Sequence, residues 1–127
     1  MSKIRIKSTI FGDETEKEIV EVFGIKNNHK VMYIYNDTKV SIELSSNTII
    51  IIRENDESRL ILKFRDNDSI TSDYYIKSLN IIVKVKTKTK LLKIDKNSLK
   101  IKYDLFIADC FSDSFTYNLE WESLKWI

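Results

Sequence analysis

The feature of this sequence that most restricts its fold is an alternation of apolar and polar residues that recurs along almost the whole chain. Ile4, Ile6 and Ile10 share one parity near the start, and Leu99 and Ile101 share one near the end, with lysine or arginine among the residues between them. A period of two places successive side chains on opposite faces of a β-strand. Each such segment is therefore a strand with one dry face and one wet face, as antiparallel sheets have.

Clusters of asparagine and aspartate interrupt the alternation at regular intervals, as at Asn36-Asp37, Asn55-Asp56 and Asp95-Lys96-Asn97. The chain has two glycines and no proline, so its turns must use other residues. Asn and Asp tolerate left-handed backbone angles and hydrogen-bond to their own turn, which makes them the natural substitutes. The breaks, of which the last is Asp109 to Asp113, divide the chain into about ten segments of strand-like length.

Composition supports an all-β fold. Twenty isoleucines, six valines and eight threonines stand against a single alanine, Ala108. β-Branched side chains suit strands, whereas alanine is the best helix former, so a helix-rich fold is excluded. A length of 127 residues is that of one domain, which we expect to span residues 1–127.

Many sequential antiparallel strands must either close on themselves or split into two packed sheets. An open sheet of this width would leave two long apolar edges exposed. Because the turns are too short for crossover connections, we expect an antiparallel up-and-down (meander) barrel of about eight to ten strands. A two-sheet sandwich is the alternative, and it would need at least one longer connection.

The remaining bulk properties favour a cytoplasmic protein. Cys110 is the one cysteine, so no internal disulfide is possible and a reducing compartment is expected. Charges at every second residue near the N-terminus do not fit a secretory signal peptide. The longest purely aliphatic run, 49–52, is far too short to span a bilayer.

Two stretches, 75–87 and 98–105, resemble the YwiB-like family of bacterial proteins of unknown function. That family's pattern has a tyrosine, a turn that usually carries glycine, a strand ending in threonine and a strand centred on tyrosine. These positions correspond here to Tyr75, Asn80, Thr87 and Tyr103, and Arg53 lies where the family tends to place an arginine. The chain departs from the pattern at Asn80, which can still supply a positive φ. The resemblance implies a calycin-like (lipocalin-type) β-barrel and brings no established activity.

The residues do not indicate an enzyme. Metal sites and catalytic triads need several His or Cys residues, and this chain has only His29 and Cys110. The carboxylates of Asp109 and Asp113 beside Cys110, in an expected turn, disfavour a reactive thiolate. Two glycines, at 12 and 24, cannot form a phosphate-binding loop. We therefore predict no catalytic residues, no metal and no cofactor.

The barrel interior is the first candidate site. Barrels of about eight strands either fill their interior with side chains or hold one small ligand, and both outcomes remain open here. Arg53 shares parity with Ile49 and Ile51, and an inward guanidinium needs a partner such as a ligand carboxylate or a tyrosine hydroxyl. The reverse parity would place Arg53 outside. The predicted site for a small, largely apolar or carboxylate ligand comprises Arg53, Tyr33, Tyr35, Phe64, Tyr103, Tyr117 and Trp121.

The outer surface is the second candidate site. Residues 84–102 include eight lysines and one acid, so this segment carries a charge of +7 and the rest of the chain −5. Alternation places four lysines on one strand face, and two more join them if the next strand pairs there. The expected lysine face comprises Lys84, Lys86, Lys88, Lys90, Lys100 and Lys102. It is either a solvated face that protects strand edges or a surface that binds RNA or an acidic protein.

Overall fold

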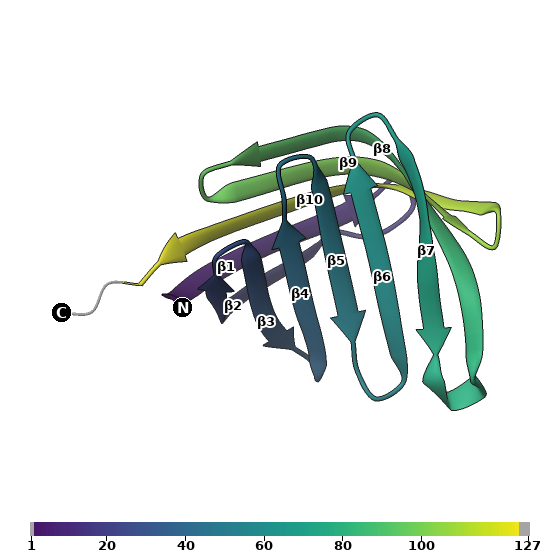
Figure 1. Cartoon of the computed structure of the whole chain (residues 1–127), viewed down its shortest axis with the longest axis horizontal. Helices are drawn as coiled ribbons and strands as arrows, with labels where there is room; N and C mark the ends of the chain where they lie inside the picture. Colours follow the sequence, from purple (N-terminus) through teal and green to yellow (C-terminus); the bar gives the residue numbers. More distant parts are fainter. Residues whose placement is uncertain (1, 125–127) are drawn as a thin grey trace.

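A computed structural model describes residues 2–124, which form ten β-strands in one closed antiparallel barrel (Figure 1). The strands are β1 (Ser2–Gly12), β2 (Glu18–Asn27), β3 (Lys30–Tyr35), β4 (Thr38–Leu44), β5 (Thr48–Glu54), β6 (Ser58–Arg65), β7 (Ser69–Ile76), β8 (Ile81–Asp95), β9 (Ser98–Ile107) and β10 (Cys110–Ser123). Each strand pairs with its neighbours in sequence, and β1 pairs with β10 to complete the ring. The predicted all-β meander barrel is confirmed.

Regular helix is confined to one short 3₁₀ turn, η1 (Lys77–Leu79), within the described residues. Across 2–124, no helix has the length and apolar character needed to cross a lipid bilayer.

Asparagine and aspartate make most of the tight turns, as expected. Positive φ angles occur at Asn28, Asn36, Asp37, Asn67, Asn80, Ala108 and Asp109, and at neither glycine. Asn36-Asp37 and Ala108-Asp109 each have two successive left-handed residues, which is the type I′ geometry that matches the twist of a hairpin. The last turn is shorter than predicted. Cys110 already begins β10, and the irregularity that follows is a bulge between Phe111 and Asp113.

The barrel is flattened into two layers whose strands cross steeply (Figure 1). Strands β3 to β7 form the front layer, while β8, β9, β10 and β1 run behind them. The two layers cross because the twist between neighbouring strands accumulates along a sheet. At the corners, a strand either bends from one layer into the other or parts from its neighbour. The side chains of one parity on every strand fill the space between the two layers.

One end of the interior is solid. Ile6 lies opposite Trp121, Ile49 lies opposite Phe64, and these four side chains are almost completely buried. They belong to a core whose other fully buried aliphatic members are Ile4, Val31, Ile42, Val85, Leu99, Ile101 and Leu119. This end lies toward the turns that join β2 to β3 and β4 to β5, and it leaves the open space to the opposite end.

At one corner of the barrel, β2 and β3 separate. The two strands pair only from Ile25–Met32 to Asn27–Lys30, after which β2 stays with β1 and β3 with β4. Gly24 lies at the point of divergence, where an added Cβ would come within 2.5 Å of the Met32 carbonyl oxygen. Glycine is required there by close backbone approach, since its φ is not positive.

At the opposite corner, side-chain hydroxyls complete the contact between strands that no longer pair. Strands β6 and β7 pair only over Ser58–Leu60 and Tyr74–Ile76. Beyond this, the Ser72 hydroxyl donates a hydrogen bond to the Ile61 carbonyl, and the Thr87 hydroxyl donates one to the Lys63 carbonyl. These two hydroxyls are buried and take the place of backbone N–H donors.

The hydroxyl bonds at this corner, which we call the hydroxyl seam, predict that replacing two threonines on one face of β8 has different effects on stability. Thr87 and Thr89 are equally buried on β8, yet the Thr89 hydroxyl has no hydrogen-bond partner among residues 2–124. T87V leaves the Lys63 carbonyl unsatisfied and should lower the free energy of unfolding by about 1–3 kcal/mol. T89V removes only an unpaired hydroxyl and should leave stability unchanged or raise it. Urea unfolding of both variants measures the difference in the free energy of unfolding. Equal losses in T87V and T89V would contradict a stabilising hydrogen bond from the Thr87 hydroxyl.

Candidate functional site

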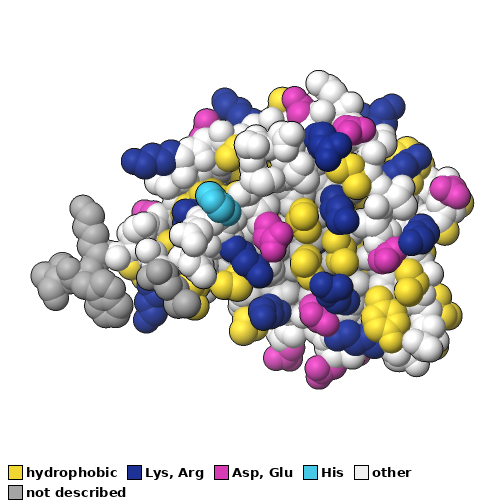
Figure 2. All heavy atoms as spheres, in the orientation of Figure 1, with side chains coloured by type: hydrophobic (Ala, Val, Ile, Leu, Met, Phe, Trp, Pro, Cys, Tyr) yellow, Lys and Arg dark blue, Asp and Glu magenta, His cyan; other side chains and the backbone are white. Residues whose placement is uncertain are grey.

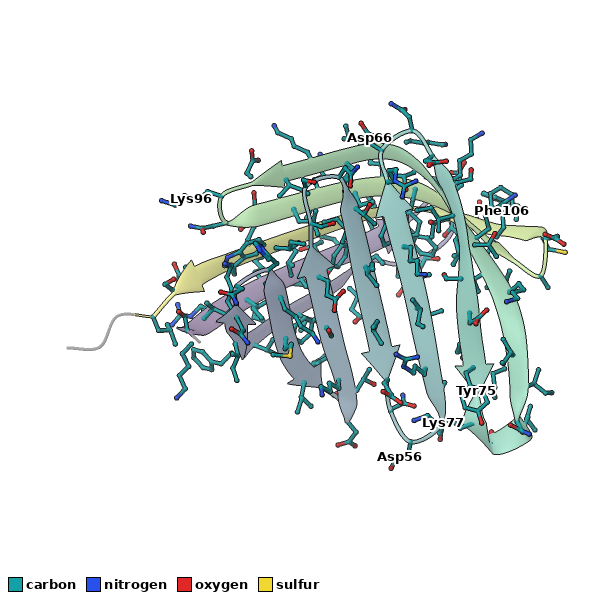
Figure 3. All side chains as sticks on the ribbon, in the orientation of Figure 1. Asp56, Asp66, Tyr75, Lys77, Lys96 and Phe106 are labelled. Carbon is teal, nitrogen blue, oxygen red and sulfur yellow. The ribbon has the colours of Figure 1, made fainter. Side chains whose placement is uncertain are left out.

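A cavity of about 280 Å³ lies inside the barrel toward its other end, near the turns that join β1 to β2, β3 to β4 and β5 to β6. In Figure 3, Asp56 and Lys77 label this end of the front layer, and Lys96 labels the far tip of the β8–β9 hairpin. The cavity is lined by Ser8, Ile10, Thr15, Glu16, Glu18, Val20, Tyr33, Tyr35, Val40, Ile51, Arg53, Leu60, Leu62, Tyr103, Leu105, Phe115 and Tyr117.

Three tyrosines provide the buried polar groups of this cavity. Tyr33 comes from the front layer, whereas Tyr103 and Tyr117 come from β9 and β10 behind it. Burial raises the pKa of both Tyr103 and Tyr117 well above the ordinary value of 10. The side chains of Ser8 and Tyr33 both act on the Tyr117 hydroxyl: Ser8 lowers its pKa and Tyr33 raises it. Both phenols therefore stay protonated at neutral pH.

Arg53 lies on the inward face of β5, at the mouth of the cavity. Its register partners are Val40 and Leu60, which also line the cavity, and its side chain remains accessible to solvent. The guanidinium acts electrostatically on Tyr103 and Tyr117 of the opposite layer. Within residues 2–124 it forms no hydrogen bond and no ion pair. Arg53 thus lines a largely apolar cavity at its solvent-accessible end without a hydrogen-bonding or ion-pairing partner among the described residues.

Two carboxylates line the same cavity and were missed by the sequence prediction. Glu16 comes from the loop before β2, and Glu18 begins that strand. Glu18 lies opposite Ile10 and has the parity of Val20, which is buried. That shared parity was the available signal, since a charged residue on a dry face at a strand end marks the rim of a barrel.

The loop that carries Glu16 is fixed by Asp113. The Asp113 carboxylate accepts hydrogen bonds from the Thr15 hydroxyl at 2.6 Å and from the Ser114 N–H at 2.8 Å, and it also receives the Glu14 N–H. An added Cβ on Gly12 would meet this carboxylate at 2.2 Å, so the glycine makes room for it. The hydrogen bond from Thr15 is the largest cause that lowers the pKa of Asp113, and the backbone N–H groups add to it.

The structure separates the predicted interior residues into two groups. Arg53, Tyr33, Tyr35, Tyr103 and Tyr117 line the cavity. Phe64 and Trp121 lie in the solid half and are absent from the lining. The Phe64 ring nonetheless contacts the Tyr103 ring edge-on at 4.7 Å, and therefore helps to position one wall.

The lysine face is on the outside of the barrel, and part of its charge is neutralised. Lys84 forms an ion pair with Asp73 at 2.6 Å, Lys90 forms one with Asp104 at 3.0 Å, and the Lys86 ammonium lies over the Phe106 ring. Acidic side chains from β7 and β9 thus contact the lysines of β8. Figure 2, which views the front layer, likewise shows basic and acidic side chains interspersed over that face.

The alternation of the lysines does not continue regularly through Lys90. The pairing of β8 with β9 shifts between Thr89 and Leu91, so Lys90 is the extra residue of a bulge. Without this bulge, the parity of Thr89 would direct Lys93 into the barrel. With it, Leu92 packs against the core and Lys93 lies opposite Lys100 on the outer face.

The remaining chemistry-bearing residues lie apart from the cavity. His29 is exposed in the turn between β2 and β3, where Figure 2 shows the one histidine at the surface. Cys110 is exposed at the start of β10. No group of three or more His, Cys, Asp or Glu side chains that could hold a metal ion occurs in the described part of the chain.

These observations define a closed, ten-stranded up-and-down β-barrel that is solid at one end and hollow at the other. The chain belongs to the family described as "Domain of unknown function (DUF1934)", which matches residues 4–119. It is similar in fold to the ywiB protein from Bacillus subtilis, whose crystal structure superimposes with a TM-score of 0.61 at 16% sequence identity. The match covers 97% of this chain and 91% of that one. No curated protein matches the chain. The resemblance to the YwiB-like family is confirmed.

The Asp113 contacts generate a pH prediction. The native pKa of the Asp113 carboxyl is lowered from its ordinary value of 3.8. The ionised carboxylate therefore contributes its full stabilisation of the loop above pH 3.8, and this stabilisation is lost as the pH falls through the lower native pKa. Below about pH 4, the amide signals of Glu14 and Ser114 should therefore shift in NMR spectra, and their exchange protection should fall. In D113N the part of this pH dependence that the Asp113 carboxylate causes should be absent, and only the effect of the other carboxylates nearby should remain.

The matched control is D109N, which changes an exposed aspartate in the neighbouring hairpin. It should retain the wild-type titration of the Glu14 and Ser114 amides. A wild-type transition centred at or above pH 4 would contradict the lowered pKa.

Proposed function

We propose that this protein is a non-enzymatic, cytoplasmic binding protein that holds a small, largely apolar ligand in the barrel cavity. The observation that carries the proposal is the combination of an apolar cavity with an unpaired arginine at its mouth. The walls are contributed chiefly by aliphatic and aromatic side chains, with a few convergent polar groups. Binding sites for small molecules generally have this composition.

The size of the cavity supports a small ligand. Its volume of about 280 Å³ is at the lower end of the range of about 300–1,000 Å³ that is usual for such sites. Trp121 and Phe64 occupy the far half of the barrel, so a long chain could not extend through it. A carboxylate or hydroxyl on the ligand would complete the hydrogen bonding of Arg53.

The positions of the reactive side chains support a binding role over catalysis. His29 and Cys110 are the sequence's only histidine and cysteine, and neither is among the residues that line the cavity. Burial raises the pKa of Tyr103 and Tyr117, so these two phenols stay protonated. Within residues 2–124, the carboxylates that line the cavity, Glu16 and Glu18, form no hydrogen bond to a hydroxyl, so no nucleophile there is paired with a base.

Filling the cavity should abolish binding of an apolar probe. L60W places a large ring at the mouth, whereas I52W adds the same ring on the outward face of the neighbouring strand. The neutral dye Nile red should fluoresce with the wild type and I52W and should fail to do so with L60W. At 100 times its Kd, the bound probe should stabilise the wild type by about 2.7 kcal/mol in thermal unfolding. Equal dye binding by all three proteins would contradict a site in the cavity.

A second candidate function is an anion-binding surface, for RNA or an acidic protein, at the end of the lysine face formed by Lys100 and Lys102, to which the structure adds Lys93. Lys93 lies directly opposite Lys100, and Lys102 follows on the same outer face. None of the three forms an ion pair within residues 2–124. Like charges directly opposite each other destabilise a sheet, so a bound anion would stabilise this arrangement.

Charge reversal tests the second function. K93E/K100E/K102E should weaken binding to single-stranded polyuridylate and lower the magnitude of its salt slope by about 2. The control is K30E/K39E/K63E, which makes the same change in net charge on the front layer. If the two triple variants bind RNA equally, the lysine face is not the binding surface.

A further inference from the structure

We propose that the ligand of the cavity is a small zwitterion, with a carboxylate and an ammonium group at the mouth and an apolar group inside, as in a free apolar amino acid. This inference rests on the proposed function and goes further by specifying the charges of the ligand. It is carried by three unpaired charged side chains of both signs, Arg53, Glu16 and Glu18, which line one cavity.

The cationic side of the mouth is Arg53. It lies on β5 between Val40 and Leu60 and lines the same cavity as Tyr103 and Tyr117. Within residues 2–124 its guanidinium forms no hydrogen bond or ion pair. Arg53 therefore keeps all five N–H donors for water or a ligand, and its planar fork matches a carboxylate.

The anionic side of the mouth is formed by Glu16 and Glu18. These residues come from the β1–β2 region, which is three strands away from β5 around the ring on the shorter side. Neither forms an ion pair or a hydrogen bond in the described part of the chain, with Arg53 or with any other residue. The loop that carries Glu16 is held by Asp113, so this carboxylate is tied to the rim.

Opposite charges that line one cavity without meeting leave a gap between them that a ligand of both charges can fill. An ammonium would lie against the glutamates and a carboxylate against Arg53. The apolar group would then extend toward Ile51 and Leu62, which are buried and line the deeper wall. A ligand with one charge would satisfy only one side and leave the other hydrated.

Four probes that share a phenyl ring on a short chain and differ in their charged groups test the inference by calorimetry at pH 7. They are L-phenylalanine, 3-phenylpropanoate, 2-phenylethylamine and uncharged 3-phenyl-1-propanol. Each charged hydrogen bond that is lost should weaken binding about tenfold. L-phenylalanine should therefore bind the wild type about tenfold more tightly than either singly charged probe, and the alcohol should bind most weakly.

Variants assign each charge to its side chain. R53Q should remove the preference for L-phenylalanine over 2-phenylethylamine, and its control R59Q changes an arginine on the outer face that pairs with Glu54. E16Q/E18Q should remove the preference for L-phenylalanine over 3-phenylpropanoate. Its control E14Q/E21Q changes two exposed glutamates of the same region that do not line the cavity.

The outcomes separate this inference from the proposed function. If Nile red binds in the cavity but the four probes bind equally or not at all, the zwitterion inference is wrong and the apolar site stands. Loss of discrimination in a control variant as large as in its partner would also overturn the inference. If neither Nile red nor any of the four probes binds, both proposals are wrong.

Discussion

The pairing of β1 with β10 is the constraint on which the rest of the structure depends. Nine residue pairs, from Ile4–Ser123 to Gly12–Phe115, join the first strand to the last. They convert a ten-strand meander with two open edges into a ring in which every strand has two neighbours. Only in that ring do the dry faces of all strands point at one another. The core and the cavity both exist because of this closure.

Within the ring, the size of the inward-facing side chains along the barrel decides which half is solid. Trp121 and Phe64 fill one half together with fully buried isoleucines and leucines. Toward the other end the inward positions hold tyrosines, whose hydroxyls need polar partners, and finally Arg53 and Glu18, whose charges need water or a counter-charge. Polarity therefore increases from the solid half of the barrel toward the mouth of the cavity.

The charge of the outer surface depends on which strands lie side by side. Lys84 and Lys90 of β8 form ion pairs with acids on the neighbouring strands and Lys86 lies over Phe106, so this surface is less basic than the charge of the segment alone. A segment's net charge describes the chain, whereas the surface potential depends on which strands lie beside it. Lys93, Lys100 and Lys102, which lie beyond the bulge, form no ion pair within residues 2–124 and leave positive charge on that part of the surface.

Much of this protein could be derived from local patterns in the sequence. Alternation identified the strands, Asn and Asp identified the turns, and parity placed Tyr33, Tyr103 and Tyr117 in the interior, because each of these depends on the conformational preferences of a few neighbouring residues. The bulge at Lys90 breaks such a pattern, and only its pairing with β9 shows where the parity changes.

Other features involve residues that are far apart in the chain. The Thr87 hydroxyl bonds to the Lys63 carbonyl, the Thr15 hydroxyl bonds to the Asp113 carboxylate, and Arg53 lines the same cavity as Tyr103 and Tyr117. The sequence by itself determined an all-β meander and, where the alternation is regular, which side chains share a strand face. Tertiary structure alone decided which half is hollow and which charges surround the hollow, since those depend on how two crossing layers meet in space.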